Sequence, residues 1–309
     1  MMHWGNTGSG RRQARLAIIE YVVERLIQAT GILVILFLAL IFIFLVREGG
    51  ATFLEVPLGD MLRTRWYPNE AYFGLVPLVL GSLLVTLGAA IVSLPLGLLS
   101  SVFIAEVAPR WMREVLKPFI EVLAGIPSVV LGFVGMLIVS PLIRERLGAP
   151  TGLTALAGSV MLGYMALPTI ISVAEDALDA VPKSYRDAAL ALGATRWQTI
   201  WRVTVPAARS GIFTAMMLGM GRAIGETMAV MMVTGNAARV PLTLDSFLRP
   251  VRTMTATIAA EMGEVAQGSI HYHVLFAIGL VLFLVTFIIN LVAAWSIFRQ
   301  GKRYGRLLS

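Results

Sequence analysis

The 309-residue sequence contains no cysteine and only three histidines. The absence of cysteine excludes disulfides, cysteine nucleophiles, iron–sulfur clusters and thiolate zinc sites. His3, His271 and His273 are too few and too scattered for an all-histidine metal site. Charged residues are also scarce, at 14% of the chain, whereas soluble domains contain about a quarter. The scarcity of charge therefore disfavours an ordinary soluble globular protein.

Apolar residues, in contrast, are abundant. They make up 57% of the chain, and the mean hydropathy is +0.81, which excludes intrinsic disorder. The net charge of +7 fits either a nucleic-acid-binding protein or the basic cytoplasmic loops of a membrane protein. The apolar content favours the second explanation. We therefore expect a lipid bilayer, and no nucleic acid, as the partner of this chain.

Six apolar stretches are long enough to cross a bilayer, which takes about 20 helical residues. They are continuous rather than alternating, which indicates helices and not barrel strands. The first has no small-x-small cleavage site after it, so we interpret it as an uncleaved span. The sequence thus predicts an all-α, polytopic membrane protein with six transmembrane helices: Leu26–Val46, Leu75–Ala105, Val122–Pro141, Gly152–Val173, Gly211–Gly235 and Val274–Phe298.

Lysine and arginine in the loops predict the orientation. With the N-terminus inside, the inner segments hold sixteen of these residues and the outer segments eight. Both termini are therefore expected in the cytoplasm, and the protein in the cytoplasmic (inner) membrane. The predicted organisation is a cytoplasmic segment (1–25), a first span (26–46), a periplasmic loop (47–74), a core of spans two to six (75–298) and a cytoplasmic tail (299–309).

The longest predicted inner loop is residues 174–210, which we call the elbow. Pro182 suits the first turn of a helix, and Lys183 to Leu192 contains good helix formers without a breaker. Gly193 is suited to the left-handed conformation that ends such a helix. The sequence therefore predicts a short helix that stops at a glycine corner.

A second short helix is expected after this corner. Thr195 and Gln198 have the spacing of a capping box, and Pro206 is expected to close the helix. Three interpretations fit this pattern: an element that transmits force from a soluble motor, an ordinary amphipathic loop, or a DNA-binding helix-turn-helix. The flanking spans leave little room for a duplex, which disfavours the third.

The elbow resembles the loop of bacterial ABC importer permeases that has the form Glu-Ala-Ala, three residues, Gly, nine residues, Ile-x-Leu-Pro. Here Asp187-Ala188-Ala189 is followed at the same spacing by Gly193 and by Val203-Thr204-Val205-Pro206. Asp replaces Glu, and Val replaces both Ile and Leu. The resemblance implies a type I ABC importer permease architecture. It also implies that Asp187, Ala188, Ala189, Gly193 and Pro206 belong to the segment that docks into an ATPase subunit.

The chain lacks a nucleotide-binding loop of its own. A Walker A motif requires Gly-x-x-x-x-Gly-Lys followed by Ser or Thr. The only Gly-Lys pair is Gly301-Lys302, which is followed by Arg303 and has no upstream glycine at the required spacing. We therefore expect no cofactor in this chain and no enzymatic activity of its own, with ATP and magnesium bound by a partner ATPase.

The fifth predicted span contains two charges, Arg222 and Glu226, which lie four residues apart and would share one helix face. A charge at mid-bilayer costs roughly 2.5–3.5 kcal/mol on insertion scales, so mutual pairing in a polar surround is expected. Gly221 and Gly225 would permit close approach of another helix. One interpretation is an ion pair that pins two helices together.

The alternative interpretation is a translocation site for an anion. The guanidinium of Arg222 offers forked donors that match the oxygens of phosphate. Glu226 would neutralise Arg222 when no anion is bound, and Thr227 could add a hydroxyl group. The hypothesis therefore assigns Arg222, Glu226 and Thr227 to anion movement.

Residues 221–230 resemble the fifth span of the Pst phosphate permeases, and their Met-Ala-Val continuation is similar to the PstC type more than to PstA. Residues 124–130 and 105–109 are also similar to PstC. The resemblance implies the permease subunit of an ATP-driven phosphate importer. Its implied partners are a PstA-like second permease subunit, two ATPase subunits at the elbow and an extracytoplasmic phosphate-binding protein. A permease for another oxyanion or a phosphonate, and a scaffold or sensor in phosphate signalling, remain alternatives.

Three weaker signals, from aromatic, histidine and acidic residues, have simpler interpretations. Trp66 and Tyr67 are expected at the membrane surface or against a binding protein. His271 and His273 would lie on opposite sides of an extended chain, which disfavours a metal pair. A solvated acidic face near the elbow is expected for Glu175, Asp176 and Asp179.

Overall fold

The computed structural model describes the main chain of residues 8–305, and side-chain burial for residues 16–295 except 244 and 293. The described chain is mostly helical, as the sequence predicts. Its one sheet is a two-stranded antiparallel hairpin of β1 (Trp66–Tyr67) and β2 (Tyr72–Phe73). Five helical segments within this part are long and apolar enough to cross a membrane: Leu16–Glu55, Val76–Val107, Ser128–Leu147, Ala155–Asp179 and Ile270–Val292.

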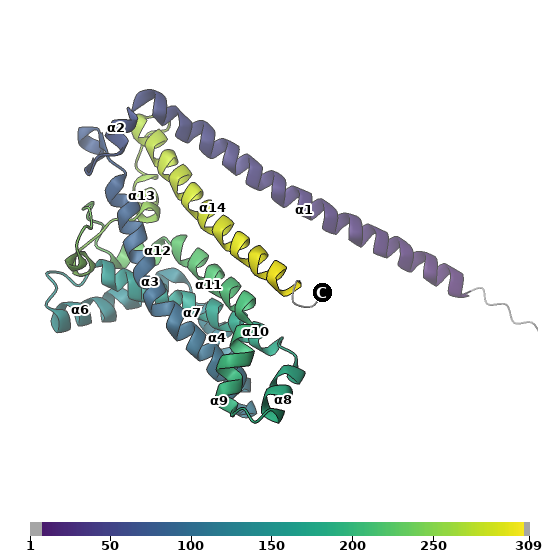
Figure 1. Ribbon diagram of the computed structural model, residues 1–309. Helices are drawn as coiled ribbons and strands as arrows, with labels where there is room; N and C mark the ends of the chain where they lie inside the picture. Colours follow the sequence, from purple (N-terminus) through teal and green to yellow (C-terminus); the bar gives the residue numbers. More distant parts are fainter. Residues whose placement is uncertain (1–7, 306–309) are drawn as a thin grey trace, which may run out of the picture.

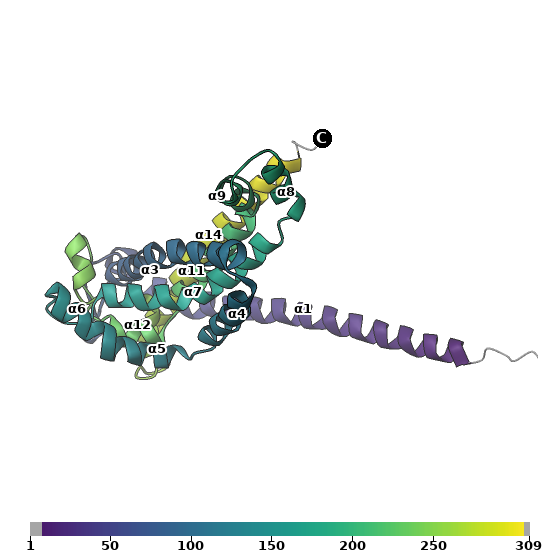
Figure 2. The ribbon, with the colours of Figure 1, turned by 90° about the horizontal axis from the view of Figure 1, so that it is seen from below.

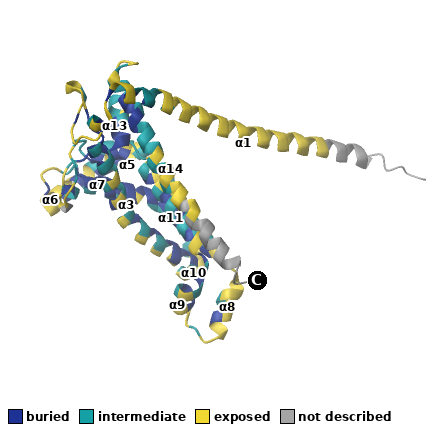
Figure 3. Ribbon diagram, turned by 45° about the horizontal axis from the view of Figure 1, so that its top comes forward, coloured by how far each residue is buried: buried dark blue, intermediate teal, exposed yellow. Residues whose placement is uncertain are grey.

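The first and last spans form a pair that meets at one end. Helix α1 (Gly8–Glu55) projects from the body and contacts α14 (Ile270–Gly305) (Figure 1). They meet near the end of the molecule that contains the β1–β2 hairpin, which we call the loop end. The rings of Phe42 and Phe283 are in contact, tilted by 38° with their centroids 5.0 Å apart. Most of α1 exposes apolar side chains (Figure 3), as expected for a surface that faces lipid or another subunit.

The centre of the body is built from α3 (Val76–Val102), α7 (Ala155–Asp179) and α11 (Arg209–Ile224), which pack side by side (Figure 2). Small residues allow these helices to approach closely, as is usual in membranes. A side chain on Gly97 or on Gly219 would clash with Ile170 of α7. Ile170 is itself 1% exposed, so the close approach encloses a packed core.

The predicted fifth span is not one helix. Helix α11 ends at Ile224, and α12 (Met228–Val233) begins after three residues without helical structure. The hydroxyl of Thr255 donates to the main-chain oxygen of Glu226 at 2.9 Å, so the interrupted backbone finds a partner within the protein. Such interruptions are tolerated at membrane depth when the protein supplies these partners. The expected unbroken span at 211–235 is therefore wrong, and six spans are not confirmed.

The third predicted span begins later than expected. Its helical run is α5 (Ser128–Val134), the π-helical turn η3 (Gly135–Val139) and α6 (Ser140–Leu147). The residues before it belong to a separate helix, α4 (Arg110–Ala124), in the predicted loop 106–121. Pro127 disfavours helix at the residue before it, which separates α4 from α5.

The described residues contain three π-helical turns, and each precedes a proline. The N–H that closes the i to i−5 hydrogen bond belongs to Ala108 in η2 (Phe103–Val107), to Ser140 in η3 and to Val205 in η4 (Ile200–Thr204). The next residue is Pro109, Pro141 or Pro206. Proline has no N–H and clashes with the carbonyl four residues earlier. In η3 and η4 the helix continues through the proline, so the wider turn relieves this contact, whereas η2 ends its helix at an extended Ala108.

The remaining elements lie at the two ends of the body (Figure 1). At the loop end are α2 (Leu58–Met61), η1 (Pro68–Glu70), η5 (Leu244–Leu248) and α13 (Met254–Glu261). At the opposite end, the elbow contains α8 (Lys183–Ala191), α9 (Arg196–Thr199), η4 and α10 (Val205–Ala207).

Candidate functional site

The elbow has the local structure that its sequence predicts. Helix α8 ends before Gly193, whose φ of +85° lies in the left-handed region that glycine tolerates best. The side chain of Thr195 accepts from the main-chain N–H of Gln198, and the side chain of Gln198 accepts from the N–H of Thr195. The two short helices therefore meet at a defined glycine corner.

The tip of the elbow presents a mixed polar and apolar surface. Asp187 and Ala188 are exposed, whereas Ala189 is buried against the body. Large apolar side chains that are at least 49% exposed surround them: Tyr185, Leu190, Leu192 and Trp197. A concentration of exposed apolar side chains on a short helix is typical of a protein-binding surface.

Pro206 does not close the second elbow helix, contrary to the sequence prediction. It lies in the first turn of α10, directly after η4, and is exposed. The wide bond from the N–H of Val205 to the oxygen of Ile200 allows the chain to continue toward α11. The elbow is therefore joined to α11 by nearly continuous helical turns rather than by a hinge at the proline.

A guanidinium–carboxylate pair attaches the elbow to η2, the turn that follows α3. Arg186 of α8 donates to Oε1 of Glu106 from Nε at 3.0 Å and from Nη2 at 2.6 Å. It also donates to the main-chain oxygens of Val181 at 2.7 Å and Leu178 at 2.9 Å. Both side chains are at most 20% exposed, so bulk water screens the pair little. The sequence analysis missed this role, although Arg186 directly precedes the Asp-Ala-Ala motif.

Two further arginines bind η2. Arg196 of α9 donates to the main-chain oxygen of Glu106 at 2.6 Å. Arg113 of α4 donates to the oxygen of Ile104 at 3.0 Å and also to that of Ala105, and it pairs with Asp179 at 3.2 Å. Cations at the carbonyl end of a helix satisfy orphan acceptors and interact favourably with the helix dipole.

The expected solvated acidic face is only partly correct. Glu175 is 2% exposed, and its Oε2 lies 2.7 Å from Nζ of Lys117, which is also 3.0 Å from Asp176. The hydrogen bonds with Glu175 and then Asp176 raise the pKa of Lys117 above its ordinary value. The sequence prediction failed for Glu175 because it did not expect a helix at α4 that would cover α7.

Arg222 lies in the last turn of α11 and is exposed. Its Nη2 donates to the main-chain oxygen of Ala124, at the end of α4, at 3.1 Å, and its Nη1 donates to the hydroxyl of Thr169 on α7 at 3.3 Å. It makes no ion pair with any carboxylate that the structure describes. The guanidinium is thus oriented by neutral acceptors and helix dipoles and keeps donors for an external anion.

Glu226 does not pair with Arg222, so the predicted mutual neutralisation is wrong. The helix ends between them, and they do not share a face of one helix. Oε1 of Glu226 instead accepts from the N–H of Thr227 at 3.1 Å, and the hydroxyl of Thr227 donates to the oxygen of Gly225 at 3.3 Å. The three predicted site residues therefore lie around one helix break, with only Arg222 as a cation.

The glycines beside this break do not contact another helix of the chain. A side chain on Gly221 would meet nothing within 4 Å, and one on Gly225 would meet only oxygens of the preceding turn. The close helix approach that the sequence predicts at these glycines is therefore absent within the described residues. This face of α11 remains open to a second polypeptide or to lipid.

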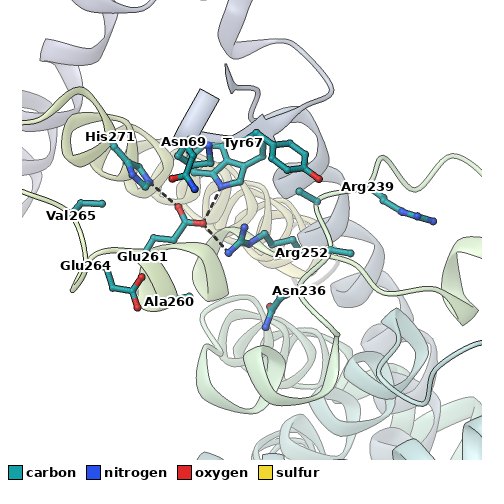
Figure 4. A pocket seen from close by; sticks show the side chains of 14 residues that line it. Tyr67, Asn69, Asn236, Arg239, Arg252, Ala260, Glu261, Glu264, Val265 and His271 are labelled. Atoms are coloured by element: carbon teal, nitrogen blue, oxygen red, sulfur yellow. Dashed lines mark hydrogen bonds and ion pairs between the residues drawn. The ribbon is translucent and has the colours of Figure 1, made fainter. Parts of the chain in front are cut away.

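The loop end contains a polar cavity of about 810 Å³, which we call the Glu261 cavity (Figure 4). Three side chains converge on the Glu261 carboxylate: Arg252 at 2.8 Å, Trp66 at 3.1 Å and His271 at 2.8 Å. Within the described part of the chain, no three histidine or acidic side chains are grouped as metal ligands. Glu261 therefore joins the β1–β2 hairpin, through Trp66, to the segment from Arg252 to His271.

This cavity corrects two weaker predictions. Trp66 is 2% exposed and belongs to the core of the loop end rather than to a membrane surface, whereas Tyr67 is 61% exposed. His271 and His273 lie in the first turn of α14, not in an extended chain. His273 is 3.6 Å from Glu48 of α1, so the two histidines contact different acidic partners.

Comparison with known proteins identifies the family of the chain. Residues 93–304 match the family of binding-protein-dependent transport system inner membrane components. The Probable ABC transporter permease protein YqgH of Bacillus subtilis is 40% identical over 86% of this chain and 87% of its own. The phosphate transport system permease protein PstC of Mesorhizobium japonicum is 31% identical over 94% of each chain.

Solved structures show the same fold at low sequence identity. A bacterial ABC transporter for import of the polysaccharide alginate covers 93% of this chain and 99% of its own, with a TM-score of 0.61 and 15% identity. The inward-facing MetNI methionine ABC transporter covers 73% and 95%, with a TM-score of 0.57 and 20% identity. The ABC importer permease architecture expected from the sequence is therefore confirmed. The chain belongs to the binding-protein-dependent inner membrane transport components, as a permease subunit integral to the inner membrane.

Proposed function

We propose that this chain is the PstC-like permease subunit of an ATP-driven importer of inorganic phosphate. The observation that carries the proposal is Arg222, an exposed guanidinium on a helix of the membrane body with no carboxylate partner among the described residues. A guanidinium binds tetrahedral oxyanions through two parallel hydrogen bonds. The phosphate transport permeases among the relatives support phosphate as the anion.

A second, PstA-like permease subunit would complete the pathway. The open space at Gly221 leaves the face beside Arg222 uncovered. Next to it, α4 exposes an apolar stripe of Trp111, Val115, Phe119 and Val122, all at least 58% exposed. Small residues and an apolar stripe around a single cation suit a seam between two membrane subunits. One chain would then supply half of the path.

Two ATPase subunits would bind at the elbows of the two permease subunits. The exposed tip around Asp187, Ala188 and Gly193 supports this assignment, because it presents apolar side chains on a short, well-defined helix. ATP and magnesium would be bound by these partners. The elbow end is then cytoplasmic, and the basic residues of the predicted inner segments support cytoplasmic termini.

The loop end would face an extracytoplasmic phosphate-binding protein. The Glu261 cavity offers a polar recess at this end, with exposed Arg239 and Tyr67 at its wall (Figure 4). Released phosphate would then pass from the loop end toward Arg222 as the two permease subunits alternate between outward-open and inward-open states.

The test is uptake of radiolabelled phosphate by the complete transporter in proteoliposomes. Arg222→Ala is expected to abolish uptake while the complex still assembles and Arg222→Lys retains a fraction, because lysine keeps the charge but not the fork. Arg144→Ala, which removes an exposed arginine of α6, is the matched control. Uptake by Arg222→Ala at the parental rate would refute the assignment and favour a scaffold or sensor. Equal competition by sulfate or a phosphonate would favour another oxyanion.

A further inference from the structure

Helix α4 contacts both η2, to which the elbow is bound, and Arg222 of the candidate anion site. Its fifteen residues cover about 22 Å at 1.5 Å per residue. Near the start of α4, Arg113 donates to the main-chain oxygens of Ile104 and Ala105 in η2. At its last residue, the oxygen of Ala124 accepts from the guanidinium of Arg222.

The elbow is bound to η2, the same turn that Arg113 binds. Arg186 of α8 pairs with Glu106 at 2.6 Å, and Arg196 of α9 donates to the main-chain oxygen of that residue. Residues 104–106 of η2 therefore contact α8, α9 and α4 together. A displacement of the elbow acts on the start of α4 through one short turn.

Along its length, α4 is attached to the body by polar contacts rather than by core packing. No residue of α4 is buried. It lies antiparallel on α7 (Figure 2), where Arg113 meets Asp179 and Lys117 meets Glu175. Within one chain, elements with few buried apolar contacts are the ones that move at low cost. Helix α4, together with the second permease subunit that would cover its outer apolar stripe, can thus shift along α7 without opening a cavity in the core of this chain.

We propose that α4 is a lever that transmits movement of the elbow to Arg222, and that Arg186, Glu106 and Arg113 are positioning residues for this movement. ATP-driven displacement of the elbow shifts α4, and the oxygen of Ala124 then binds or releases the guanidinium of Arg222. The donors of Arg222 become available to the anion at one stage of the cycle. This inference rests on the proposed function, because it concerns the same anion site.

The first experiment separates ATP hydrolysis from transport in the reconstituted transporter. Arg113→Gln is expected to lower phosphate uptake per ATP hydrolysed by about tenfold, within the usual range of coupling free energies, while the ATPase subunits still co-purify. Arg110→Gln is the matched control, because Arg110 also lies at the start of α4 but, among the described residues, pairs only with Glu114 of its own helix. Parental uptake per ATP in Arg113→Gln would overturn the proposal.

A charge exchange tests the attachment of the elbow. Glu106→Arg or Arg186→Glu alone is expected to uncouple the transporter, whereas the double variant places the same two charges in exchanged positions and recovers part of the coupling. Recovery would be measured again as uptake per ATP, with co-purification of the ATPase as the assembly check. If the double variant is no better coupled than the worse single variant, this pair does not transmit the movement.

A third experiment observes α4 directly. The chain has no cysteine, so Glu121→Cys on α4 and Leu62→Cys at the loop end, both exposed and outside the proposed interfaces, can be spin-labelled without background from this subunit. The distance between the labels is expected to shift between nucleotide-free and ATP-bound complexes in the otherwise parental chain and in Arg110→Gln, and this shift is expected to be lost in Arg113→Gln. An unchanged distance in the parental chain would refute the lever. Arg222→Ala should keep the shift while losing uptake, so failure of the lever and failure of the anion assignment are seen separately.

Discussion

Nζ of Lys117 lies 2.7 Å from Oε2 of Glu175, and this contact joins an exposed helix to a buried carboxylate. The side chain of Glu175 is 3% exposed, whereas that of Lys117 is 41% exposed. The second carboxylate oxygen of Glu175 has no hydrogen-bond partner among the described atoms. The lysine therefore supplies the main compensation for a charge on α7 that has lost its water.

Removal of this lysine is expected to destabilise the protein. Lys117→Met leaves Glu175 buried and unpaired, which costs about 1–3 kcal/mol, less than for a fully buried pair because Lys117 is partly exposed. Thermal unfolding of the purified permease would show a lower Tm. Lys117→Arg is the control and should stay near the parental Tm, and Lys117→Met with Glu175→Gln should recover part of the loss. A parental Tm in Lys117→Met would show that Glu175 does not depend on this contact.

The same pair predicts a simple pH dependence. Glu175 and Asp176 raise the pKa of Lys117, so the stability that the pair provides is complete below the unfolded lysine pKa of about 10.4 and is lost only as the pH rises through the folded value. The Tm difference between the parental protein and Lys117→Met should therefore be constant from pH 7 to pH 9. A difference that shrinks over this interval would contradict the raised pKa.

The Glu261 carboxylate is expected to stabilise the loop end. Glu261→Gln removes the charge that compensates Arg252, whose side chain is 19% exposed, and weakens the contacts with Trp66 and His271. The expected loss is about 2–4 kcal/mol, as for a largely buried pair that loses one partner. Glu264→Gln is the matched control, because Glu264 lines the same cavity but is exposed. Equal Tm values for the two variants would refute the role of Glu261.

Local sequence rules predicted the elbow well because its structure depends on near neighbours. The capping box joins Thr195 to Gln198, three residues apart, and Gly193 ends α8 through its own backbone conformation. The long apolar runs likewise predicted α1, α3, α7 and α14, although α1 continues beyond Val46 to Glu55. These features require no knowledge of the tertiary structure.

Several features that the sequence analysis missed depend on distant residues. The break after Ile224 is stabilised by Thr255, which apolar content cannot reveal in a span that otherwise looks continuous. The burial of Glu175 depends on Lys117, and the attachment of Arg186 depends on Glu106. Hydrophobic periodicity reports which face of an element is buried but not which partner covers it.

The glycine corner of the elbow provides a test of ATPase docking. At Gly193 the φ of +85° disfavours any residue with a branched side chain, although no atom lies within 4 Å of an added Cβ. Gly193→Val is therefore expected to cost about 1–2 kcal/mol in the docked conformation, which weakens ATPase binding by roughly tenfold.

Gly193→Asn is the control, since asparagine tolerates the left-handed region and should bind nearly as well. Affinity for the isolated ATPase subunit would be measured with the permease in detergent, with Tm as a check of folding. Because the corner is exposed and no atom lies within 4 Å of an added Cβ, the undocked elbow can relax this strain, so both variants should melt close to the parental temperature. Equal affinities for valine and asparagine would show that docking does not require this backbone conformation.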